Sequence, residues 1–186
     1  MSYEINILVV NQTQPVHLPF EPSFVLVNEI EHEGCGRYFS SWPFYSCMHG
    51  VQYSLIEDEE SIFLGAFPLC EVDFDYTFAN PCPEWIPEEY AEQNFHPLII
   101  KPSVYPDFIR VLKFLLESSP NGFLLFQTRY QGAERDTVFG TISLDDFIAM
   151  LDRREVMFNT CYIIAQKTEI EEPVYYVDAQ GRIWRR

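Results

Sequence analysis

The sequence predicts an α+β fold, a largely antiparallel β-sheet with two or three helices packed against it. Segments with strand character far outnumber segments with helical periodicity. They follow one another mostly in hairpin order, without the strand–helix alternation of a doubly wound fold. The 186 residues include eight glycines but neither G-x-G-x-x-G nor G-x-x-x-x-G-K, so no phosphate-binding loop is predicted.

Five strands are expected in the first part of the chain. Residues 3–10 are rich in apolar and β-branched residues, which favour strands. Pro68 interrupts a later strand region, which indicates an edge position or a bulge. Three prolines between residues 80 and 87 predict a loop. The other strands are expected at residues 23–30, 52–56, 61–67 and 70–78.

Two helices are expected in the second part. Apolar residues recur at helical spacing between residues 106 and 117, with Pro106 in the first turn and Pro120-Asn121-Gly122 after the end. Ser143 is a favourable N-cap for a second helix, whose first turn contains Asp145 and Asp146. Apolar positions carry that helix onward: Leu144, Phe147, Ile148 and Leu151.

Strands flank these helices. Residues 123–130 and 137–142 are expected to be strands joined by the polar loop 131–135, and residues 156–165 a buried strand. A last hairpin is expected from residues 174–177 and 182–184.

Charge divides the chain at about residue 100. Residues 1–100 contain 16 acidic residues and one basic residue, Arg37, a net charge of −15, whereas residues 101–186 contain 12 acidic and 11 basic residues, a net of −1. The first part is also rich in proline and aromatic residues. No Gly/Ser linker separates the two parts, so a single domain over residues 1–186 is expected.

The composition also bounds location and partners. A net charge of −16 disfavours direct binding to nucleic acid or to anionic membranes. No signal peptide and no membrane-spanning stretch is recognised, and the five scattered cysteines are typical of reduced thiols. A cytoplasmic protein is therefore expected.

The clearest candidate site is the acidic stripe, which we define as Glu71, Asp73 and Asp75. On a strand these residues share one face, where three like charges are unfavourable unless a cation or a basic partner lies nearby. The stripe is thus interpreted as a contact surface for a basic protein, or as ligands for Mg²⁺ or Mn²⁺. The alternative is a solvated edge strand that is kept charged against aggregation.

An aromatic anchor is expected close to the stripe in sequence. Trp85 lies in a proline-rich loop that can present a large ring at small entropic cost, as interfaces use. The alternative is a ring that folds back onto the sheet. Acidic residues follow the loop, among them Glu88 and Glu89.

A zinc site and nucleophilic catalysis have less support. His32, Cys35, Cys47 and His49 form H-x2-C-x11-C-x-H, but the C-x-H half is tighter than in usual zinc knuckles. No G-x-S-x-G motif is present. We therefore expect no metal, no cofactor and no catalytic residues.

These features resemble, in general character, small acidic cytoplasmic inhibitors such as bacterial toxin-immunity proteins. The resemblance implies a protein that neutralises a basic, nuclease-type toxin by occluding its active-site cleft, with contacts from Glu71, Asp73, Asp75, Trp85, Glu88 and Glu89. Two alternatives stay open. The same carboxylates could serve a metal-dependent hydrolase, or the chain could be a DNA mimic whose carboxylates imitate phosphates.

Overall fold

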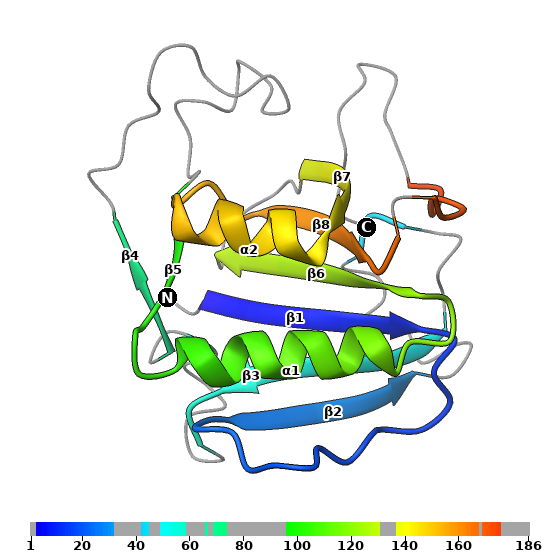
Figure 1. Cartoon of the computed structure of the whole chain (residues 1–186), viewed down its shortest axis with the longest axis horizontal. Coiled ribbons are helices and arrows are strands. Elements are labelled where there is room, and N and C mark those ends of the chain that lie inside the picture. Colours follow the sequence, from blue (N-terminus) through cyan, green and yellow to red (C-terminus); the bar gives the residue numbers. More distant parts are fainter. Residues whose placement is uncertain are drawn as a thin grey trace.

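A six-stranded sheet forms the centre of the structure (Figure 1). The computed structural model describes residues 3–31, 42–44, 49–58, 66, 69–73, 96–130, 137–167 and 169–175, and the structural statements below concern these residues. The order of the strands across the sheet is β2-β3-β1-β6-β8-β7, and every neighbouring pair is antiparallel except β7 with β8. The strands are β1 (Tyr3–Val10), β2 (Val25–Glu31), β3 (Gly50–Ile56), β6 (Phe123–Tyr130), β7 (Thr137–Ser143) and β8 (Thr160–Ala165).

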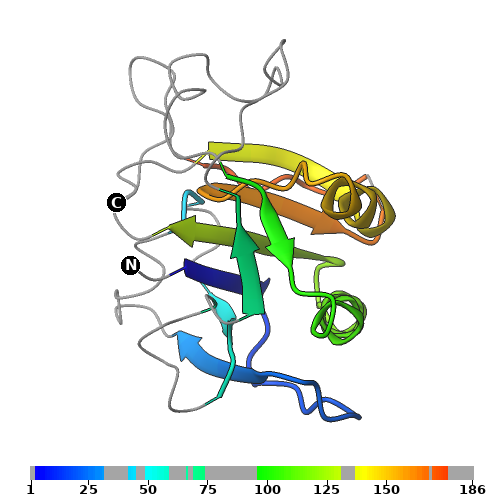
Figure 2. The ribbon, with the colours of Figure 1, turned by 90° about the vertical axis from the view of Figure 1, so that its left-hand side faces the viewer.

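Two helices, α1 (Tyr105–Glu117) and α2 (Leu144–Asp152), lie on one side of this sheet (Figure 2). The expected fold class, an α+β fold with a largely antiparallel sheet and helices packed against it, is confirmed. Each end of the sheet takes its strands from one part of the chain, because β1, β2 and β3 precede residue 100 and the others follow it. A second, two-stranded sheet pairs β4 (Cys70–Val72) with β5 (Leu98–Ile100).

The order of the last three strands differs from the expected hairpin succession. β6 and β7 follow one another in sequence, yet β8 lies between them and runs parallel to β7. Helix α2 provides the crossover that a parallel pair requires. The reason is burial: all six residues of β8 are buried, so this strand belongs inside the sheet, whereas most of β7 is only half-buried.

β8 also begins later than expected, at Thr160. Asn159 has φ 59°, a left-handed conformation that ends a turn and interrupts any strand through residues 156–159. Of the expected strand 61–67 only Ala66 is described, and it lies in a turn. Of the expected last hairpin only Val174 and Tyr175 are described, and Tyr175 forms an isolated antiparallel bridge with Phe44; residues 176–186 lie outside the described residues.

Apolar side chains cover both faces of the central strands. On the helix side, Phe126 has no exposed surface and packs against the rings of Phe147 and Tyr162, at centroid distances of 4.9 and 6.4 Å. On the opposite side a second cluster contains Trp42 and Phe44. The helix α1 contributes the apolar residues that its periodicity predicts: Phe108, Val111, Leu112 and Leu115.

The described cysteines agree with the expectation of reduced thiols. Cys70 and Cys161 are both buried, and neither is in a disulfide. The helices of the described residues include none that is long and apolar enough to cross a membrane.

Ser143 caps α2 as its sequence predicts. Its hydroxyl oxygen accepts a hydrogen bond from the backbone N–H of Asp146 at 3.1 Å, and its hydroxyl donates to the Asp146 carboxylate at 2.6 Å. The cap thereby satisfies a backbone donor that the first helical turn leaves without a partner.

The first prediction tests this cap. Ser143→Ala should lower the free energy of unfolding by about 1 kcal/mol, because the Asp146 N–H loses its acceptor. Urea denaturation measures the change. Ser103→Ala, in the exposed turn before α1, is the matched control and should change it by less than about 0.5 kcal/mol. Equal effects of the two substitutions would contradict the capping role.

Candidate functional site

The acidic stripe begins on β4, where the alternation of side chains agrees with the sequence. Cys70 is buried, Glu71 is exposed and Val72 is half-buried against the core. Glu71 makes no hydrogen bond or ion pair in the described part of the chain. Its carboxylate is therefore available to a partner from solvent.

The strand itself is shorter than the expected residues 70–78. Pairing stops at Val72, which faces Leu98, so the next pair along the ladder would be Asp73 with Pro97. Proline has no backbone N–H to donate, which ends the ladder there. Instead, the carbonyl oxygen of Asp73 lies 3.1 Å from Nδ1 of His96.

Two of the three carboxylates of the acidic stripe are described. Glu71 lies within β4 and the half-buried Asp73 lies just beyond it. The other predicted contact residues lie outside the described residues: Asp75, Trp85, Glu88 and Glu89.

Cys70, next to Glu71, is a poor nucleophile. Burial raises the pKa of its thiol to about 12, the charge of Lys101 lowers it, and the charge of Glu71 raises it further. The thiol donates a hydrogen bond to the carbonyl oxygen of Ala66 at 3.2 Å. A thiol protonated at neutral pH is not the reactive thiolate form, so Cys70 is a structural residue.

The described residues contain no group of three or more His, Cys, Asp or Glu side chains that could hold a metal ion. Of the predicted zinc ligands only His49 is described; it is exposed, and its carbonyl oxygen accepts from the N–H of Asn11 at 2.9 Å. His32, Cys35 and Cys47 lie outside the described residues.

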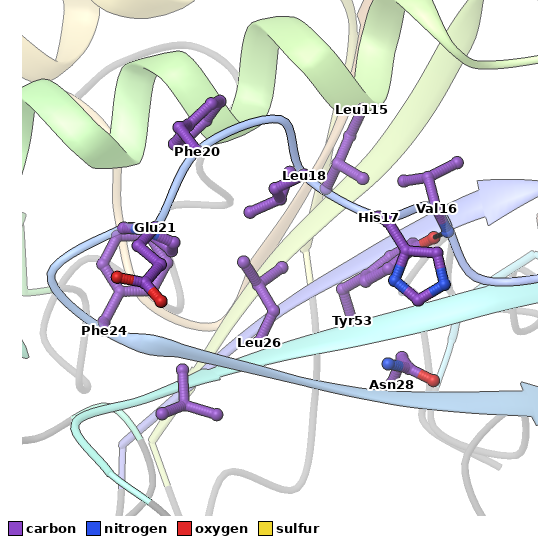
Figure 3. A pocket seen from close by; sticks show the side chains of 12 residues that line it. Val16, His17, Leu18, Phe20, Glu21, Phe24, Leu26, Asn28, Tyr53 and Leu115 are labelled. Carbon is purple, nitrogen blue, oxygen red and sulfur yellow. Dashed lines mark hydrogen bonds between the residues drawn. The ribbon is translucent and has the colours of Figure 1, made fainter.

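A groove that sequence reasoning missed lies at the β2 end of the sheet (Figure 3). One wall is the segment between β1 and β2, which we call the strap (residues 11–24), and the other walls are β2, β3 and α1. The volume is about 450 Å³, within the range of ligand pockets. Its lining is mainly apolar: Val16, Leu18, Phe20, Pro22, Phe24, Val25, Leu26, Tyr53 and Leu115, with His17, Glu21 and Asn28 as the polar members.

Hydrogen bonds hold the first half of the strap to β3. The hydroxyl of Tyr53 donates to Oε1 of Gln12 at 2.6 Å and accepts from the backbone N–H of Val16 at 3.0 Å. Because Gln12 and Tyr53 are buried, these bonds form away from competing water. These two hydrogen bonds therefore fix the first half of the strap to β3.

The second half of the strap is fixed to α1. The backbone N–H of Ser23 donates to the carboxylate of Asp107 at 2.9 Å, and this bond is the main reason why the pKa of Asp107 is lowered. Arg110, which pairs with Asp107 at 3.2 Å, also stacks over the ring of Phe20 at 3.8 Å. The groove thus has two anchored walls before any ligand binds.

A sequence signal for the strap exists. Val16, Leu18 and Phe20 alternate with His17 and Pro19, the pattern of a segment with one apolar face. The surrounding prolines argue against a strand, so the segment is interpreted as an ordinary loop despite this alternation.

Comparison with protein-family models, with curated proteins and with solved structures finds no match for this chain.

The second prediction concerns the hydroxyl of Tyr53. Tyr53→Phe should lower the free energy of unfolding at pH 7 by about 1–2 kcal/mol, because it leaves Val16 N–H and Gln12 without this partner. Urea denaturation again measures the loss. Tyr175→Phe, on an exposed ring, is the control and should have little effect.

The same variant should also change how the stability of the protein depends on pH in the alkaline range. Burial raises the pKa of Tyr53 above its ordinary value of 10, although the hydrogen bond from Val16 opposes this. Above about pH 10 the unfolded chain loses the proton while the folded chain retains it, so stability falls as the pH rises. Tyr53→Phe should make this fall shallower. An unchanged slope above about pH 10 would count against the buried, protonated hydroxyl.

Proposed function

We propose that this protein is an acidic inhibitor that binds a basic protein and occludes its active-site cleft, as an immunity protein does for a nuclease-type toxin. The observation that carries the proposal is the excess of exposed carboxylates without a partner of their own. Glu21, Glu57 and Glu71 are all exposed, and none forms an ion pair in the described part of the chain.

Two basic residues of the second part pair with acidic residues of the same part. Arg110 pairs with Asp107 at 3.2 Å and Arg153 pairs with Glu155 at 2.8 Å, both within residues 101–186. Arg129 is buried. The sequence of the first part carries a net charge of −15, with Arg37 as its one basic residue.

Such a surface suits a basic cleft in two ways. Long-range attraction between opposite charges raises the rate of encounter, and it does so less as salt increases. Rigid aromatic anchors then lengthen the lifetime of the complex, a role for which Trp85 is our candidate. Occlusion needs no catalytic group.

The first experiment is affinity capture of the tagged chain from its native lysate at low and at high salt. The proposal expects one stoichiometric basic protein, retained more strongly at low salt, whose catalytic activity the purified chain inhibits. Capture without inhibition would contradict the proposal. If nothing specific is retained and Mg²⁺ or Mn²⁺ raises the melting temperature, the metal-dependent hydrolase takes its place.

The third prediction separates steering from anchoring in that complex. The double variant Glu71→Lys with Asp75→Lys should lower the association rate about tenfold at low salt, and the deficit should shrink as screening increases. Trp85→Ala should instead raise the dissociation rate, by about thirtyfold for a hot-spot residue. Surface plasmon resonance measures both rates.

Glu117→Lys provides the control for a change of charge alone. Glu117 is exposed at the end of α1, where a lysine is favourable to the helix dipole, and it is not a predicted contact. If it slows association per unit charge as much as the stripe variants do, net charge rather than the stripe guides the encounter.

A further inference from the structure

β2 is the terminal strand of the six-stranded sheet within the described residues. Only β3 pairs with it, from Val25 opposite Ile56 to Glu31 opposite Gly50. In an antiparallel pair, alternate residues direct their backbone N–H and C=O groups away from the neighbouring strand. No backbone hydrogen bond joins the described strap to β2, so β2 offers these groups to a further strand.

The opposite edge of the sheet is less accessible. Thr141 of β7 donates a hydrogen bond from its hydroxyl to the carboxylate of Glu172 at 2.7 Å, so Glu172 lies beside that strand. Gly140, where the β7–β8 register shifts, also makes β7 irregular. Of the two edges, β2 is the more regular one for strand addition.

The groove lies directly beside β2 and could receive the side chains of an added strand. Leu26 on β2 and Leu18 on the strap lie opposite one another across it, and Leu115 of α1 reaches toward it from above (Figure 3). Side chains of a strand that point to one face recur about every 7 Å. A strand laid along β2 would therefore direct every second side chain toward this apolar lining.

The charge around the groove selects for a basic strand. Its lining residues include Glu21, which is exposed and has no ion pair in the described chain, and no lysine or arginine. Because Ile56 pairs with Val25, Glu57 and Asp58 leave β3 at the end of the sheet where β2 begins. The nearby Arg110 is occupied by Asp107 and Phe20.

A second copy of this chain is a poor occupant for the same reason. Its net charge of −16 would bring like charges together at the edge. A small apolar molecule would fill the groove but leave the backbone groups of β2 unused.

We propose that β2 and the groove bind an extended segment of the basic partner, which pairs its backbone with β2 and alternates apolar and basic side chains. The apolar side chains enter the groove between the strap and β2, and the basic ones point to the opposite face of the added strand, where the overall negative charge of the first part of the chain attracts them. This mode is β-strand addition, in which the backbone supplies affinity and the pockets supply specificity. It rests on the proposed function only in taking that protein as the source of the segment.

The test uses the full ¹⁵N-labelled chain and two blocked hexapeptides of equal charge, one with lysine and valine alternating and one with three lysines followed by three valines. The alternating peptide should bind about tenfold more tightly, since only it can present valines on one face. It should also slow amide hydrogen exchange within residues 25–28. Equal binding of the two peptides, or shifts confined to other acidic regions, would overturn the proposal.

The fourth prediction uses two variants to test whether the peptide binds in the groove. Leu18→Trp fills the groove and should abolish the tenfold preference for the alternating peptide. Glu21→Gln changes an exposed side chain and should leave the stability of the fold unchanged. It should weaken binding of the alternating peptide about two- to fivefold, and less at high salt. Glu117→Gln removes the same charge outside the groove and should leave binding unchanged. No effect of either groove variant would contradict the assignment.

Failure of this inference and failure of the proposed function are distinguishable. A captured basic partner that inhibits normally but does not protect residues 25–28 from exchange overturns the β2 site and leaves the inhibitor standing. Selective binding of the alternating peptide without any captured partner supports the β2 site and overturns the inhibitor. A dimer that forms with rising concentration and protects residues 25–28 would identify a second copy as the occupant and overturn the proposal.

Discussion

Burial of the central strands on both faces is the constraint on which the rest of the structure depends. Every residue of β8 is buried, and the helix-side cluster around Phe126 has a counterpart around Trp42 on the opposite face. Strands of this kind have no solvated side, so their backbone groups must find partners within the sheet. This places β8 between two other strands and leaves the sheet edges and the surrounding segments as places where a ligand can bind.

Local signals predicted the elements whose cause is local. The periodicity of α1 and the cap at Ser143 depend on residues within a few positions of each other, and the structure agrees with both. The neighbours of β8 depend instead on which apolar run packs between which others, and all these runs look alike in sequence. The end of β4 at Val72 likewise could not be predicted from local sequence, because it depends on Pro97, which is close to β4 only after folding.

The candidate sites divide in the same way. Alternation predicted that Glu71 would be exposed between more buried neighbours, and it is. The groove depends on Tyr53 holding Val16 and on Asp107 holding Ser23, contacts between residues 37 and 84 positions apart. No pattern within the strap indicates that Tyr53 and Asp107 are its partners. The proline-rich strap was therefore interpreted as a plain loop, although it forms the wall of a groove.

The acidity of the first part is related to the open edge of the sheet at β2. An unprotected edge strand pairs readily with other chains, and charge is one means by which proteins prevent this. Here the charge has a single sign, with Glu21 in the groove and no lysine or arginine among its lining residues. Such an edge disfavours pairing with another copy of the same chain and favours the basic strand that we propose. Since attraction acts at long range and the apolar groove acts only on contact, salt should govern how fast a partner arrives, and the fit between Leu18 and Leu26 how long it stays.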